Sequence, residues 1–83
     1  MRYTVVWAPR AENRLADIYN QALDKPAVTA ASNEIDRLLA NDADRKGRPL
    51  NGDRFLTVPP LTVIFVVSPD DCLVQVREVY RTS

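Results

Sequence analysis

The stretch RFLTVPPLTVIFVVSPDDCLVQVREVYR, residues 54–81, decides the fold because it contains three apolar runs rich in β-branched residues. The runs are Phe55 to Val58, Leu61 to Val67 and Cys72 to Tyr80. They are separated by two segments that typically break strands, Pro59-Pro60 and Ser68-Pro69-Asp70-Asp71. Residues 54–81 therefore predict a three-stranded antiparallel meander.

The chain before the meander predicts one strand and a helical hairpin. Tyr3 to Trp7 alternates in the β-rich manner of a strand. Apolar residues recur at helical spacing from Pro9 to Leu23, with Ala22 and Leu23 closing the apolar stripe, and again from about Ala27 to Ala40. Asp24 is the expected N-cap of the second helix. The predicted class is α+β, in the order strand, two helices, three strands. The helical hairpin is expected to cover one face of a small, mainly antiparallel sheet.

Alternation along the last strand predicts which side chains share a face. One face is predicted to carry Cys72, Val74, Val76, Glu78 and Tyr80, and the other Leu73, Gln75, Arg77, Val79 and Arg81. Cys72, at the start of the strand, is expected to be a small core residue.

The segment NDADRKGRPLNGD, residues 41–53, is predicted to be the one substantial loop. It holds both glycines, Gly47 and Gly52, and three cations, Arg45, Lys46 and Arg48. A loop on a rigid scaffold commonly carries function. The alternative is a solvated connector whose charges only keep it in water.

Length and composition restrict the class of protein. Eighty-three residues, 1–83, are expected to form a single domain with a modest core. No His and one Cys are present, so neither a structural zinc site nor a cofactor is expected. The longest apolar run is too short to cross a membrane, and the first residues show no export signal, so a cytoplasmic location is expected. The eleven basic and eleven acidic residues cancel, which argues against strong autonomous nucleic-acid binding.

Segments along nearly the whole chain resemble the RelE/ParE superfamily of small bacterial toxins. The residues that carry the likeness are Tyr3–Ala11 (YTVVWAPRA), Leu15–Ile18 (LADI), Ile35, Leu38-Leu39, Gly47–Leu50 with Gly52, Val63–Val67 and Val74–Arg81. The resemblance implies the toxin of a type II toxin–antitoxin pair, held by a cognate antitoxin in a hetero-oligomer. RelE-like members cut mRNA on the ribosome without a metal, and ParE-like members poison DNA gyrase. A third alternative is a non-catalytic module that only docks an antitoxin.

The resemblance also implies candidate site residues. Catalytic roles are expected for Arg54, Tyr80 and Arg81, and contacts with RNA or the ribosome for Lys46, Arg48, Arg45 and Arg77. For Lys46, Arg48 and Arg54 the alternatives are solvated surface or contacts with the antitoxin. For Arg77 and Arg81 the alternative is an ion pair with a neighbouring carboxylate. The chain departs from the family pattern at Thr57 and Thr62, where many members have arginine. A threonine can accept a hydrogen bond but cannot neutralise a phosphate, so the altered site is expected to be weaker.

Overall fold

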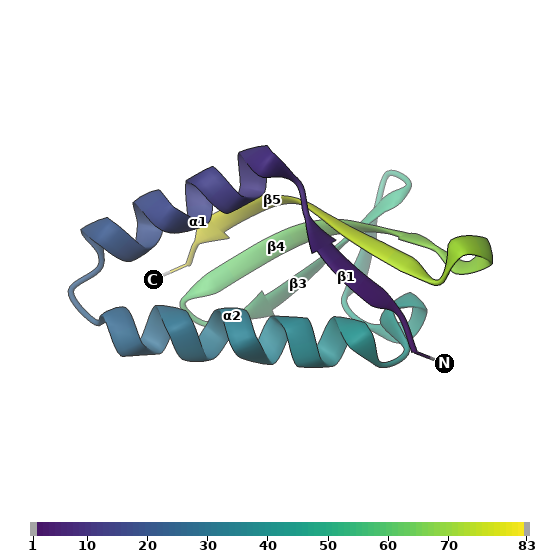
Figure 1. Cartoon of the computed structure of the whole chain (residues 1–83), viewed down its shortest axis with the longest axis horizontal. Coiled ribbons are helices and arrows are strands. Elements are labelled where there is room, and N and C mark those ends of the chain that lie inside the picture. The colour runs from purple at the N-terminus through teal and green to yellow at the C-terminus, as the bar shows by residue number, and fades with distance from the viewer. Residues whose placement is uncertain (1, 83) are drawn as a thin grey trace.

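A computed structural model of the chain describes residues 2–82, with only the backbone for Leu50 (Figure 1). Its elements are β1 (Thr4–Trp7), α1 (Pro9–Gln21), α2 (Lys25–Ala40), β2 (Arg48–Leu50), β3 (Asp53–Val58), β4 (Leu61–Ser68) and β5 (Leu73–Arg81). Short 3-10 turns lie at Ala43–Arg45 and Pro69–Asp71. The predicted α+β order is confirmed, and β2 is an addition to it.

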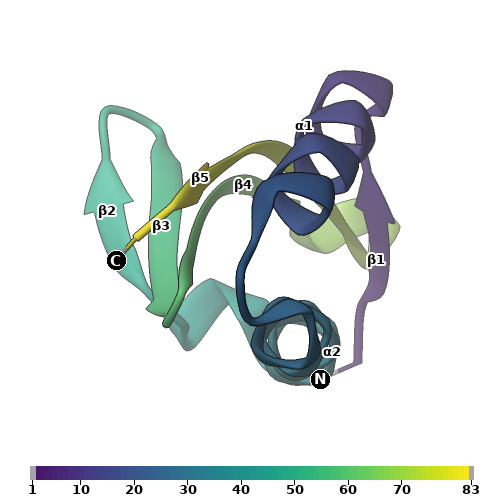
Figure 2. The ribbon, with the colours of Figure 1, turned by 90° about the vertical axis from the view of Figure 1, so that its left-hand side faces the viewer.

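The five strands form one mixed sheet in the order β1-β5-β4-β3-β2. The meander β3-β4-β5 is antiparallel, as predicted, whereas β1 pairs in parallel with the first half of β5. Seen end-on, the sheet is curved and α2 lies inside the curve, while α1 lies along β5 (Figure 2). The second half of β5 has no β1 partner in the register, and α1 covers it there.

One hydrophobic core joins the helices to a single face of the sheet. Its largest fully buried side chains are Phe65, Ile35, Leu39, Leu61, Val63, Val74, Val76 and Val79. Each fully buried aliphatic or aromatic side chain contributes about 1.5–3 kcal/mol by leaving water. The predicted packing of a helical hairpin on one sheet face is therefore confirmed.

The helix ends follow local chemistry. Pro9 occupies the first turn of α1, and Asp24 caps α2 as predicted, because its side chain accepts a hydrogen bond from the Ala27 amide at 3.1 Å. The expectation that the first helix reaches Leu23 was wrong. Ala22 is already extended, and the Leu23 side chain is fully exposed in the turn between the helices. The chain must leave the helix there to reverse its direction.

Uninterrupted alternation along the last strand was also wrong. Ile64 pairs with Glu78 but the next residue, Phe65, pairs with Val76, so Arg77 is the extra residue of a β-bulge. The bulge places Val79 on the core face with Val74 and Val76, and moves Glu78 and Tyr80 to the opposite face. Cys72 is not a core residue either. It is exposed and has a φ of 51° at the end of the turn before β5.

The basic segment is more ordered than a loop. Residues 48–50 form β2, which pairs antiparallel with β3 at the edge of the sheet. Gly47 enters this hairpin with a φ of 68°, and a Cβ atom there would lie 2.2 Å from the Phe55 carbonyl oxygen. Only glycine fits this close approach. The turn between β3 and β4 contains a cis peptide bond between Pro59 and Pro60.

Candidate functional site

The sheet face opposite the core carries a row of polar and half-buried side chains. The register places Thr57, Thr62 and Tyr80 side by side across β3, β4 and β5. The next row contains Phe55, Ile64 and Glu78. Tyr80 is 43% exposed, so its ring is available to a ligand. We call this side of the sheet the open face.

At one end of the open face, three side chains from α1 and β5 form a hydrogen-bonded cluster. Arg10 donates from Nη2 to Glu78 Oε1 at 2.7 Å, and the Tyr80 hydroxyl donates to the same oxygen at 2.9 Å. The hydrogen bond from Tyr80 lowers the pKa of Glu78 by more than burial raises it, and the contact with Arg10 lowers it further. The same hydrogen bond raises the pKa of Tyr80. At neutral pH the cluster therefore pairs an ionised carboxylate with a protonated phenol.

A chain of hydroxyl groups lies beside this cluster. The Oγ1 atoms of Thr57 and Thr62 are 2.9 Å apart, and those of Thr62 and Thr82 are 2.6 Å apart. Thr57 and Thr62 stand at the two positions where the family pattern commonly has arginine. Their hydroxyls hydrogen-bond to each other, and neither threonine supplies a positive charge.

The three residues expected to be catalytic do not converge. Tyr80 lies on the open face, whereas Arg81 pairs with the buried Leu61 and therefore points to the helix side. Arg54 pairs with Phe65 further along the sheet. Its guanidinium donates to the backbone carbonyls of residues 46 and 47, at 2.7 Å from Nε and 3.2 Å from Nη2. Arg54 therefore holds the turn before β2 in place, and the catalytic roles stay predictions.

The predicted RNA-facing cations lie near the opposite end of the sheet from Arg81. Arg45 belongs to a 3-10 turn and Arg48 to β2, and both are exposed, while Lys46 is half-buried. Arg77 lies at the bulge and forms an ion pair of 3.6 Å with Asp53 across the sheet. The ion-pair alternative for Arg77 is therefore confirmed. The Arg77 side chain is more than half exposed to solvent, so this ion pair contributes little to stability.

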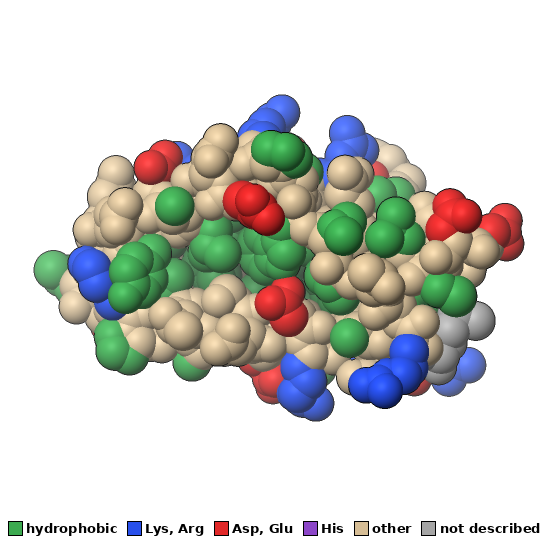
Figure 3. Space-filling view, in the orientation of Figure 1, with side chains coloured by type: hydrophobic (Ala, Val, Ile, Leu, Met, Phe, Trp, Pro, Cys, Tyr) green, Lys and Arg blue, Asp and Glu red, His purple; other side chains and the backbone are tan. Residues whose placement is uncertain are grey.

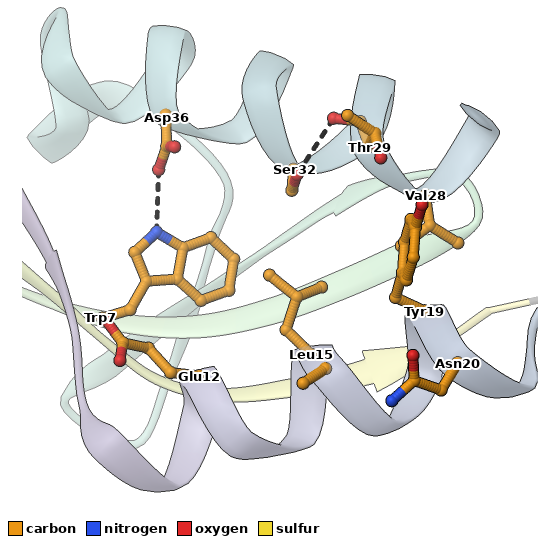
Figure 4. Close-up of a pocket in the computed structure, with 10 residues that line it drawn as sticks. Trp7, Glu12, Leu15, Tyr19, Asn20, Val28, Thr29, Ser32 and Asp36 are labelled. Carbon is orange, nitrogen blue, oxygen red and sulfur yellow. Dashed lines mark hydrogen bonds between the residues drawn. The ribbon is translucent and has the colours of Figure 1, made fainter. Parts of the chain in front are cut away.

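A second candidate site is the groove between α1 and α2, a cavity of about 470 Å³. The space-filling view shows its apolar floor between the helices and acidic side chains on its rims (Figure 3). Leu15, Tyr19 and Val28 line one end of the groove (Figure 4). At the other end, Trp7 donates a hydrogen bond from Nε1 to Asp36 Oδ1 at 2.8 Å. Its two carboxylates come from Glu12 and Asp36.

Sequence reasoning missed Arg10 and Glu78 as members of a site, and it missed the groove. Arg10 and Glu78 are 68 positions apart, and no local pattern joins them. The only available signal was the pair Glu78-x-Tyr80 on a strand, whose side chains share a face. The groove had a weaker signal, because Leu15 and Tyr19 are four residues apart on one helix face.

Among residues 2–82, no helix is long and apolar enough to cross a membrane. No group of three or more His, Cys, Asp or Glu side chains in that range is placed to hold a metal ion.

Several known proteins resemble this chain in structure. No protein-family model matches the chain, and no curated protein matches it in sequence. A chain of the RelBE2 toxin–antitoxin complex from Mycobacterium tuberculosis is similar in structure, with a TM-score of 0.81 and 18% identity over 98% of this chain and 92% of that one. A chain of the chromosomal ParDE system from P. aeruginosa has a TM-score of 0.78 and 26% identity, over 99% of this chain and 98% of that one. The isolated RelE toxin of E. coli has a TM-score of 0.65 and 13% identity, over 98% of this chain and 85% of that one.

These neighbours define the class of fold. The chain has the RelE/ParE toxin fold along nearly its whole described length, and the resemblance predicted from the sequence is confirmed. RelE and ParE relatives occur together among the neighbours, so the fold is common to both kinds of toxin.

Proposed function

We propose that this protein is the toxin of a type II toxin–antitoxin pair and works in the cytoplasm. The observation that carries the proposal is the similarity, over 98–99% of the chain, to chains from two toxin–antitoxin complexes at TM-scores of 0.81 and 0.78. In this proposal the cognate antitoxin forms a hetero-oligomer with the chain and keeps it inactive until the antitoxin is lost.

The groove between the helices is the proposed docking site for the antitoxin. Its apolar floor of Leu15, Tyr19 and Val28 suits the apolar face of an amphipathic tail. The carboxylates of Glu12 and Asp36 on the rims favour a tail with basic side chains beside its apolar anchors. Such a partner stabilises a small domain by mass action, since it binds only the folded chain.

For the target, we propose ribosome-dependent cleavage of mRNA. The exposed cations Arg45 and Arg48, with Lys46 between them, are suited to contacts with RNA phosphates. Tyr80, on the open face, can stack on a base or transfer a proton. The ribosome would supply most of the affinity for mRNA, which agrees with the zero net charge of the chain.

Poisoning of DNA gyrase is the second candidate, and two observations favour it. The ParDE chain is the more similar in sequence of the two complexes, at 26% against 18%. Moreover, Thr57 and Thr62 form a neutral hydroxyl pair where a ribonuclease would benefit from cations. A non-catalytic module that only binds an antitoxin is the third candidate.

Expression of the chain without its antitoxin distinguishes the three candidates. We expect growth arrest, blocked translation and mRNA cut within codons, mapped by primer extension. Gyrase-linked DNA breaks with intact mRNA would support the second candidate, and unaffected growth the third.

Single alanine variants then locate the site. We expect Arg48→Ala and Arg81→Ala to be less toxic than wild type. Arg37→Ala serves as the matched control, because Arg37 is an exposed arginine on α2 whose guanidinium pairs with Glu34 of its own helix. Equal toxicity of all three variants would contradict the assigned site.

A further inference from the structure

One end of the groove between α1 and α2 combines an aromatic wall with two carboxylates. Trp7, the last residue of β1, is half-buried and lines this end together with Glu12 from the first turn of α1 and Asp36 from α2. Its indole reaches across the groove, where Nε1 donates to Asp36 Oδ1 at 2.8 Å (Figure 4). This hydrogen bond joins β1 to α2 and fixes the orientation of the ring.

Neither carboxylate is neutralised by a cation of its own helix. The positions three and four residues from Glu12 and from Asp36, where an intrahelical partner would stand, hold no lysine or arginine. Glu34, which does not line the groove, pairs instead with Arg37 three residues further on. Among residues 2–82, no lysine or arginine lines the groove. The two carboxylates at the Trp7 end are therefore left to a cation from outside the chain.

The opposite end of the groove differs, because the chain supplies its own cation there. Lys25 Nζ lies 5.7 Å from the centroid of the Tyr19 ring. The same ammonium group donates to the carbonyls of Asn20 and Ala22, at 3.3 and 3.0 Å. The two aromatic ends of the groove are thus opposite in charge, so a cationic side chain of a partner is attracted to Trp7 and repelled at Tyr19.

We propose that the Trp7 end of the groove is a subsite for an arginine side chain of the cognate antitoxin. Its guanidinium stacks on the indole and pairs with Glu12 and Asp36. This subsite rests on the proposed docking of the antitoxin and names the anchor that the groove selects. Arginine suits it better than lysine, because a planar guanidinium stacks on an aromatic ring and binds a carboxylate through two parallel N–H groups.

The groove also sets the spacing between this arginine and the apolar anchors of the partner. Glu12, Leu15 and Tyr19 line the groove from α1 at intervals of three and four residues. At about 1.5 Å per residue, Glu12 and Tyr19 lie about 10 Å apart along the helix. A helical partner segment that lies along the groove therefore carries its arginine about one turn from an apolar residue over Leu15. A second apolar residue, over Tyr19 and Val28, follows after about one more turn.

Binding of two synthetic peptides to the full chain tests the subsite. Both are amphipathic helices with leucine at the two apolar positions of this spacing, and they differ only in having arginine or glutamine at the remaining position. Trp7 is the only tryptophan of the chain, so its fluorescence and its single indole N–H signal in NMR report occupancy of the subsite itself. We expect the arginine peptide to shift that signal and to bind about tenfold more tightly than the glutamine peptide.

Two variants of the chain remove one carboxylate each with almost no change in shape. Asp36→Asn keeps an oxygen that accepts from the Trp7 indole, and Glu12→Gln keeps the length of the side chain. We expect each variant to bind the arginine peptide about threefold more weakly and the glutamine peptide as wild type does, whereas a merely structural role would affect both peptides alike. Asp17→Asn is the matched control, because Asp17 is an exposed carboxylate of α1 that lines the cavity beside Tyr80 and not the groove.

The outcomes separate the subsite from the proposed function. Equal affinity of the two peptides, or no shift of the Trp7 signal with either, would show that the groove has no arginine subsite. The proposed toxin function would then stand, since expression of the chain alone tests it separately. If the arginine peptide binds as expected but the expressed chain leaves growth unaffected, the toxin role is wrong, and the subsite stands as the anchor of a module that only binds its partner.

Discussion

Replacing Gly47 by alanine tests how the turn before β2 is held. A Cβ atom at this position would lie 2.2 Å from the carbonyl oxygen of Phe55 and 2.9 Å from its carbonyl carbon. Both atoms belong to the backbone of β3, so no side-chain rotation can relieve the contact. We therefore expect Gly47→Ala to shift the β2–β3 hairpin and to weaken the carbonyl contacts that Arg54 makes there.

Gly52→Ala is the matched control for this substitution. Gly52 also has a positive φ, 90°, but a Cβ atom there meets nothing within 4 Å. Both variants incur the cost of a left-handed alanine, about 1–2 kcal/mol. Only Gly47→Ala adds a steric cost, about 1–3 kcal/mol for an overpacked site. In a domain of this size, each 1 kcal/mol lowers Tm by about 4–8 °C.

Urea and thermal unfolding, followed by circular dichroism, measure the difference between the two variants. We expect Gly47→Ala to be less stable than Gly52→Ala by about 1–3 kcal/mol, with a similar m-value. If the two variants unfold at the same midpoint, the close approach of Gly47 to β3 does not constrain the hairpin, and the reasoning is refuted.

Three further predictions concern single side chains. Arg54→Ala should lower the free energy of unfolding by about 1.5–3 kcal/mol through its lost backbone contacts, whereas the exposed Arg48→Ala should change it by less than about 0.5 kcal/mol; equal urea midpoints would contradict this. Asp24→Ala should cost about 1 kcal/mol through loss of the α2 N-cap, measured in the same way, and no loss would show that the cap is unimportant. Glu78 has a lowered pKa, so its stabilising contribution should be complete above the ordinary carboxyl pKa and lost as pH falls through the folded-state value. Thermal unfolding of Glu78→Gln against pH should lack this part of the acid destabilisation, and identical profiles would contradict the assignment.

Much of the fold was predictable because its signals are local. The breaks at Pro59-Pro60 and at residues 68–71 delimit the meander, and the Asp24 cap marks the start of α2. The parallel pairing of β1 with β5 had no such signal, since it joins residues about seventy positions apart. The antiparallel meander itself was predictable since short turns join its strands.

The candidate site was predictable only in part. Tyr80 was singled out from the sequence, and it lies on the open face. Arg54 was also singled out, but its hydrogen bonds to backbone carbonyls give it a structural role that no sequence pattern indicates. Arg10 looked like an ordinary solvated residue at a helix start, and only the packing of α1 on β5 brings it to Glu78.

The sequence by itself therefore determined β1, the two helices and the meander, though not β2, since periodicity, caps and strand breaks act over a few residues. The tertiary structure alone decided which side chains meet. The bulge at Arg77 is visible only in the pairing of β4 with β5, and it exchanges the faces of Glu78, Val79 and Tyr80. The physical reason is that a one-residue shift in a strand of period two reverses every side chain beyond it.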